Sequence, residues 1–149
     1  MRTRTLASVL ITCVSLVGCG GNDSPPTGTE ADALAGTVWQ LAQVETSGDV
    51  AFDVEDPENF SVRFLPGSAV VIKDGCNECT GTYAYAPNVG FGVLEFSVTC
   101  TELTCIPPPS LSAYSQWLLS AHEGGVHLGK LRVVTETPRL WLVHEPVVD

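Results

Sequence analysis

The sequence predicts a mainly β domain, a small antiparallel barrel or sandwich with one α-helix, preceded by a leader and a flexible tether. Most of the chain after residue 33 alternates apolar and polar residues with a period of two, which is typical of half-buried strands. The period becomes helical only once, near residue 110. One helix cannot supply the crossovers of a parallel sheet, so short antiparallel strands in a closed or two-layer arrangement are expected.

The expected strands are short segments separated by turn residues: 37–44, 60–65, 69–73, 81–86, 93–99, 126–128, 131–136 and 139–144. The segment 93–99 shows the alternation clearly, because Leu94, Phe96 and Val98 share one face. Its hairpin with the preceding strand turns at Pro87–Gly90. The sequence therefore predicts Leu94, Phe96 and Val98 inside the domain.

The expected helix follows Pro109, with Ser110 as its N-cap candidate. Apolar residues then recur at helical spacing at Leu111, Tyr114, Trp117, Leu118 and Ala121. Gly124-Gly125 is expected to end this helix, because glycine is a poor helix former.

Residues 1–18 have the pattern of a removable signal peptide, with basic residues before an apolar run too short to span a bilayer. The segment Leu16–Cys19 is similar to a bacterial lipobox, so Cys19 is expected to receive the lipid anchor. The alternative is a secreted protein in which Cys19 is incidental. Gly20, rather than an aspartate, favours sorting to the outer membrane, facing the periplasm. Residues 19–33 are a tether without residues to bury, and 34–146 form one domain.

Charge narrows the possible partners. The chain of 149 residues carries 7 basic and 17 acidic side chains, for a net charge of −10. Nucleic acid is excluded as a partner, since it is a polyanion. We expect the membrane to be contacted through the lipid, while a protein or small-molecule partner is unknown.

Four cysteines fall inside the domain, and the preferred pairing is nested: Cys76 with Cys105 and Cys79 with Cys100. An even number of cysteines in an exported domain favours disulfides. Two other uses are open. The four thiols have the spacing of a zinc site, and Cys76 and Cys79 have the spacing of a redox pair.

Other candidate site residues have simpler explanations. The histidines His122, His127 and His144 lack the spacing of a metal site and are expected at the surface or rim. An acidic run formed by Asp53, Glu55, Asp56 and Glu58 is expected to be a solvated loop, with calcium binding as the alternative. Five aromatic residues are expected in the core, or at a barrel mouth that takes an apolar ligand: Trp39, Tyr83, Tyr85, Trp117 and Trp141.

Several strings together resemble the META domain of the HslJ-like heat-shock lipoproteins. They are Leu34–Leu41 with its Gly-Thr-x-Trp, Gly75-Cys76-Asn77 with Gly81-Thr82-Tyr83, Thr101-x3-Cys105, and the closing Leu140-Trp141-Leu142. The resemblance covers residues 34–146, and it implies a lipocalin-like antiparallel barrel with one helix and an envelope location. Cys79 and Cys100 depart from the common pattern, which supports pairing them with each other.

The resemblance implies no catalytic residues, cofactor or metal, and it associates the family with heat-shock response and antibiotic resistance. We therefore expect a non-enzymatic, lipid-anchored envelope protein with a binding or stress-tolerance role. The alternatives are a carrier of a small apolar ligand in the barrel interior and a thiol redox protein using Cys76 and Cys79.

Overall fold

The computed structural model describes residues 34–47, 49–104 and 111–148. Nine strands, two 3₁₀ turns and one α-helix follow one another in this part of the chain. They are β1 (Val38–Thr46), β2 (Asp49–Asp53), η1 (Pro57–Asn59), β3 (Phe60–Leu65), η2 (Pro66–Ser68), β4 (Ala69–Asp74), β5 (Asn77–Ala86), β6 (Gly92–Cys100), α2 (Tyr114–Leu119), β7 (Ala121–His127), β8 (Lys130–Thr135) and β9 (Trp141–Pro146).

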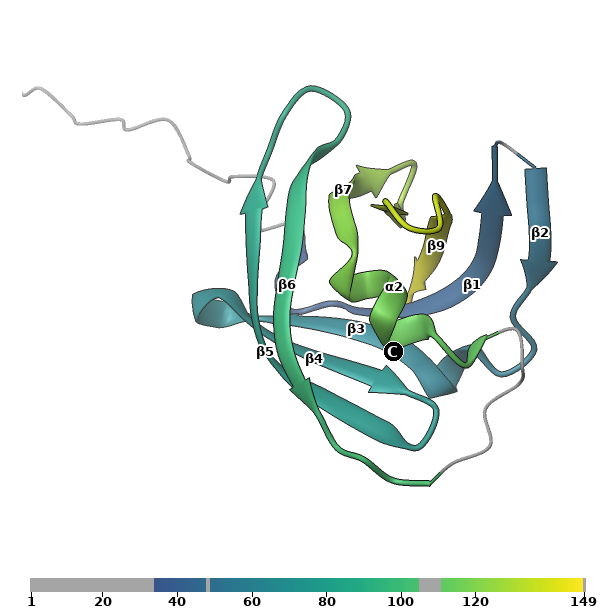
Figure 1. Cartoon of the computed structure of the whole chain (residues 1–149). Coiled ribbons are helices and arrows are strands. Elements are labelled where there is room, and N and C mark those ends of the chain that lie inside the picture. The colour runs from purple at the N-terminus through teal and green to yellow at the C-terminus, as the bar shows by residue number, and fades with distance from the viewer. Residues whose placement is uncertain (1–33, 48, 105–110, 149) are drawn as a thin grey trace, which may run out of the picture.

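Eight of these strands close into an antiparallel barrel, as the sequence predicted (Figure 1). Neighbours follow chain order from β3 to β9, and β9 pairs with β1 to complete the ring. One edge of β1 is shared, because its first half pairs with β3 and its second half with β2. The hairpin of β1 and β2 consequently stands at the rim of the barrel (Figure 1).

Alternate residues of the strands fill the barrel interior. The aromatic ring of Phe64 on β3 packs against those of Tyr83 and Phe96, with ring centroids 4.8 and 6.1 Å away. Leu94 and Phe96 are buried and Val98 packs partly buried against them, so the predicted inward face is confirmed. Gly81 permits the close approach of β5 and β6, because a Cβ there would lie 2.1 Å from the carbonyl oxygen of Ser97.

The helix is shorter than the sequence predicted. It begins at Tyr114, with Ala113 as an N-cap that makes no side-chain hydrogen bond, and Ser110 lies outside the described residues. Residues 121–127 form β7, so the prediction that Gly124-Gly125 ends the helix was wrong. The reason is a packing contact: a Cβ at Gly124 would lie 2.6 Å from Leu94, and glycine lets β7 approach β6.

The strand β2 had no sequence signal. Its residues show no clean alternation, and only Phe52 is partly buried against the core. Within the sheet, β2 pairs only with β1 among the described strands. Across the described ranges, no helix has the length and apolar character needed to cross a membrane.

Candidate functional site

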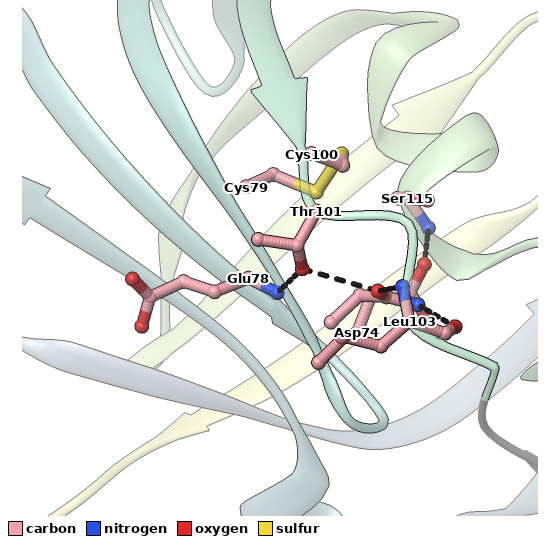
Figure 2. The surroundings of a disulfide bond; sticks show 8 residues. Asp74, Glu78, Cys79, Cys100, Thr101, Leu103 and Ser115 are labelled. Atoms are coloured by element: carbon pink, nitrogen blue, oxygen red, sulfur yellow. Dashed lines mark hydrogen bonds between the residues drawn. A yellow bond between two sulfur atoms is a disulfide. The ribbon is translucent and has the colours of Figure 1, made fainter.

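One end of the barrel is fastened by a disulfide between Cys79 on β5 and Cys100 on β6 (Figure 2). The two residues are directly opposite in the antiparallel register, and this confirms their predicted pairing. Cys76 is also disulfide-bonded, while its predicted partner Cys105 lies outside the described residues. Because Cys79 is bonded to Cys100, Cys76 and Cys79 do not form a disulfide with each other. In this disulfide-bonded state, none of these three sulfurs is a free thiolate.

Hydrogen bonds around Asn77 hold the segment after β6 against the turn between β4 and β5. The Oδ1 atom of Asn77 accepts hydrogen bonds from the backbone N–H of Leu103 at 2.7 Å and from the hydroxyl of Thr101 at 3.1 Å. Its Nδ2 donates to the carbonyl of Leu103 at 3.3 Å. The Thr101 hydroxyl in turn accepts the N–H of Glu78 at 3.1 Å (Figure 2). We call Asn77, Glu78, Thr101 and Leu103 the Asn77 latch.

The Asn77 latch explains why Gly75, Cys76 and Asn77 occur together. Gly75 has a φ of +63°, in the left-handed region that favours glycine, and it starts the tight turn between β4 and β5. Asn77 then satisfies backbone groups of the segment that follows β6. The most specific string in the sequence therefore has a structural role.

A histidine and a tyrosine form a buried polar pair inside the barrel. The Tyr114 hydroxyl on α2 lies 2.9 Å from Nε2 of His144 on β9, and both residues are fully buried. Burial lowers the pKa of His144 to about 4 and raises the pKa of Tyr114 well above its ordinary value. The backbone of Leu131 and Leu142 favours the protonated imidazole and opposes this lowering, but the effect of burial on the pKa is larger.

The prediction of three surface or rim histidines was therefore wrong for His144. Alternation along β9 places it on the inward face with Leu142, and α2 covers that end of the barrel. His127 is exposed at the end of β7, as expected. His122 is half-buried in β7 rather than beside a helix C-terminus.

The acidic run extends from Asp53 at the end of β2 to Glu58 in η1, just before β3. Asp53 accepts a hydrogen bond from Gln43 at 2.8 Å, and Lys73 donates to the carbonyl of Glu58 at 2.9 Å. Glu55 and Asp56 are exposed. Within the described residues, no three or more His, Cys, Asp or Glu side chains gather in a way that would hold a metal ion.

The five singled-out aromatic residues divide between interior and surface. Trp39 and Tyr83 are buried in the core, and Tyr85 and Trp117 are half-buried against it. Trp141 differs from these four because it faces outward. Its neighbours in the chain, Leu140 and Leu142, belong to the core, and alternate residues of a strand point to opposite faces. Packing of aromatic rings in the interior favours the core interpretation over an open barrel mouth.

The outer face beside Trp141 holds an open pocket of about 500 Å³, the arginine pocket. Its lining residues come from β1, the turn after it, β8, the turn before β9, and β9: Glu45, Ser47, Arg132, Arg139 and Trp141. Arg132 Nη2 lies 3.4 Å from Glu45 Oε1, and its guanidinium carbon lies 5.9 Å from the centre of the Trp141 ring. Arg139 is exposed and forms no ion pair with any residue that the structure describes.

Sequence reasoning singled out Trp141 but missed its neighbours. The alternation of the strands could have indicated Arg132. It stands between two buried residues, Leu131 and Val133, and Trp141 likewise stands between Leu140 and Leu142, so each faces outward. Two adjacent strands thus place their polar or aromatic residues on one outer face. Glu45 could not be found this way, since it reaches this face through the pairing of the first strand with the last.

The fold and these sites define a small closed antiparallel barrel with one α-helix in its described part and a disulfide at one end. A model of the META domain family matches residues 32–142, and the chain belongs to this family. The NMR structure of a protein from Burkholderia xenovorans is similar, with a TM-score of 0.58 and 17% sequence identity over 80% of this chain and 87% of that chain. At this identity the likeness shows the fold alone. A search of curated proteins gives no match.

Proposed function

We propose that this protein is a non-catalytic, lipid-anchored protein of the bacterial envelope, whose META domain binds a ligand near the membrane surface. The leader in residues 1–18 and the lipobox-like Leu16–Cys19 support the anchor and the export. Gly20, in place of an aspartate after Cys19, supports sorting of the protein to the outer membrane, with the domain facing the periplasm. Membership of the META family supports a role in envelope stress or antibiotic tolerance, which the resemblance to HslJ-like lipoproteins implies.

The arginine pocket is the observation that favours binding over catalysis. It presents the exposed Arg139 guanidinium beside the half-buried Trp141, a combination suited to recognition. Groups that suit acid–base or nucleophilic chemistry lie elsewhere. His144 and Tyr114 are sealed in the core, and Cys79 and Cys100 are bonded to each other.

The interior carrier remains a weaker proposal. Phe64, Tyr83 and Phe96 belong to the packed core, and the ring of Phe64 contacts both of the others. An apolar ligand would have to displace this packed core, at a cost of several kcal/mol by the size of typical core substitutions.

The anchor is tested by replacing Cys19 with serine and separating membranes from soluble proteins. Cys19→Ser should move the protein to the soluble fraction, because serine cannot form the thioether. Cys13→Ser is the matched control, since Cys13 lies within the leader and is removed with it. Membrane retention of Cys19→Ser, or an unmodified N-terminal cysteine by mass spectrometry of the wild type, would refute the anchor.

A second experiment tests the role in the cell. Deleting the gene should increase sensitivity to envelope stress or antibiotics, and the wild-type gene should restore tolerance. Complementation with Arg139→Gln should fail if binding in the arginine pocket is the basis of that role. Full complementation by this variant, with normal protein levels, would separate the physiological role from the pocket.

A further inference from the structure

We propose that the arginine pocket binds a small monoanion with a planar apolar group, such as an aromatic carboxylate. The proposal rests on the binding function above and names its ligand class. Three properties of the pocket support it: its charge, its aromatic wall and its size.

The charge of the pocket fits one negative group. Arg132 is paired with Glu45 at 3.4 Å, so these two charges largely compensate each other. Arg139 adds a guanidinium without an ionic partner among the residues described. The guanidinium group is planar and can donate two parallel hydrogen bonds to the two oxygens of one carboxylate. The whole chain has a net charge of −10, which repels a ligand with several negative charges more strongly than one with a single charge. A monoanion is therefore favoured over a polyanion.

The Trp141 ring supplies the apolar wall. Phe91 contacts this ring edge to face, with centroids 5.7 Å apart, and Arg132 lies over it at 5.9 Å. These contacts restrain a large aromatic side chain that is partly exposed on the outer face. Planar groups stack on such rings, and the stacking contributes about 0.5–1.5 kcal/mol of binding free energy in addition to the burial of apolar surface.

The size of the pocket fits a small ligand. Its volume of about 500 Å³ lies within the range of small-molecule sites. It is open to solvent, so the ligand keeps part of its surface in water. The turn that carries Ser47, whose φ is +50°, borders the pocket and supplies a hydroxyl next to the charged groups.

Glu45 makes the proposal sharper, because it competes with the ligand. Its side chain is only 13% exposed and already occupies Arg132. The carboxylate of a bound ligand would interact with Arg139. To reach Arg132 as well, it would have to share that guanidinium with Glu45 or displace Glu45 from it. Glu45→Gln removes the competing charge and should therefore strengthen binding, whereas loss of a purely structural ion pair would weaken it or leave it unchanged.

The test uses the full-length protein in non-ionic detergent, with 2-naphthoate as the probe and 2-naphthamide as its uncharged counterpart. Calorimetric titration should show saturable binding of 2-naphthoate, and binding of 2-naphthamide at least tenfold weaker. Arg139→Gln should weaken 2-naphthoate binding about tenfold, the effect of losing one charge-assisted interaction. Arg63→Gln is the matched control, because Arg63 is exposed on β3 and does not line the pocket. It should change affinity less than twofold.

Each result decides the proposal. Binding of 2-naphthoate that depends on Arg139 and strengthens in Glu45→Gln supports the site and its ligand class. Equal binding of acid and amide, equal loss in Arg139→Gln and Arg63→Gln, or no saturable binding overturns it. Such a failure would leave the anchored envelope location intact, since the Cys19→Ser fractionation tests that separately.

Discussion

The Asn77 latch and the arginine pocket use polar groups in opposite ways. At the latch, the amide of Asn77 makes three hydrogen bonds within the chain, next to the Cys79–Cys100 disulfide. In the pocket, Arg132 has one carboxylate partner at 3.4 Å, and Arg139 is exposed to solvent. The polar groups of the latch are used within the fold, whereas Arg139 in the pocket keeps its charge exposed, and this is why we propose the pocket as the binding site. The most specific sequence motif and the proposed binding pocket therefore lie in different parts of the barrel.

The largest expected effect is on the disulfide beside the latch. Replacing Cys79 and Cys100 together with alanine should lower the free energy of unfolding by about 3 kcal/mol, because the unfolded chain loses a cross-link. The barrel should still form, since its core packing is unchanged. Urea unfolding measures the change in free energy, and circular dichroism shows whether the barrel still forms. Peptide mapping of the non-reduced wild type must show Cys79 joined to Cys100, and a Cys76–Cys79 bond would contradict the structure.

The buried pair in the barrel interior should make stability depend on pH. The pKa of His144 is about 4 in the folded protein, against 6.5 for an ordinary histidine. The unfolded chain therefore takes up a proton that the folded protein does not as pH falls from 6.5 to about 4. His144 contributes its full stability above pH 6.5 and loses about 3 kcal/mol across this window. Unfolding of His144→Gln should depend less steeply on pH, and an unchanged slope would contradict the assignment.

The latch itself should matter somewhat less than the disulfide. Asn77→Ala removes three hydrogen bonds and should cost about 2 kcal/mol, since such bonds are partly exposed here. Asn88→Ala is the control, because the side chain of Asn88 accepts only the N–H of its neighbour Val89. Thermal unfolding should separate the two variants clearly. If both lower the stability equally, the latch does not stabilise the fold.

The smallest effect on stability is expected in the pocket. Arg139→Gln should change the free energy of unfolding by less than about 0.5 kcal/mol, as is usual for exposed residues without a structural contact. Its effect should be confined to ligand binding. A loss of stability as large as that of Asn77→Ala would mean that the two regions do not differ in the way described above.

The sequence predicted the strands of the barrel well because their faces alternate between core and solvent. The segment 60–65 matches β3 to the residue. Prediction failed where a contact distant in sequence decides the structure. Gly124 and Gly125 read as a helix end, yet they pack against β6 and the tip of its hairpin.

The same limit applies to the site. Strand alternation could have placed Arg132 and Trp141 together, but Glu45 joins them only through barrel closure. His144 looked like a surface residue because its partner, Tyr114, lies on another element. The Cys79–Cys100 disulfide was predictable because an even number of cysteines behind a leader-like segment favours disulfides over the zinc and redox alternatives.

Pairing of β1 with β9 also governs how the protein folds. Gln40 and Glu145 are partners in this pairing although they lie near opposite ends of the domain. Contacts of such high sequence separation slow folding, because a long loop must close before they form. A chain that leaves its site of synthesis in one direction cannot complete the ring until its last strand has arrived. Loss of β9 would leave both β1 and β8 without their closing partner.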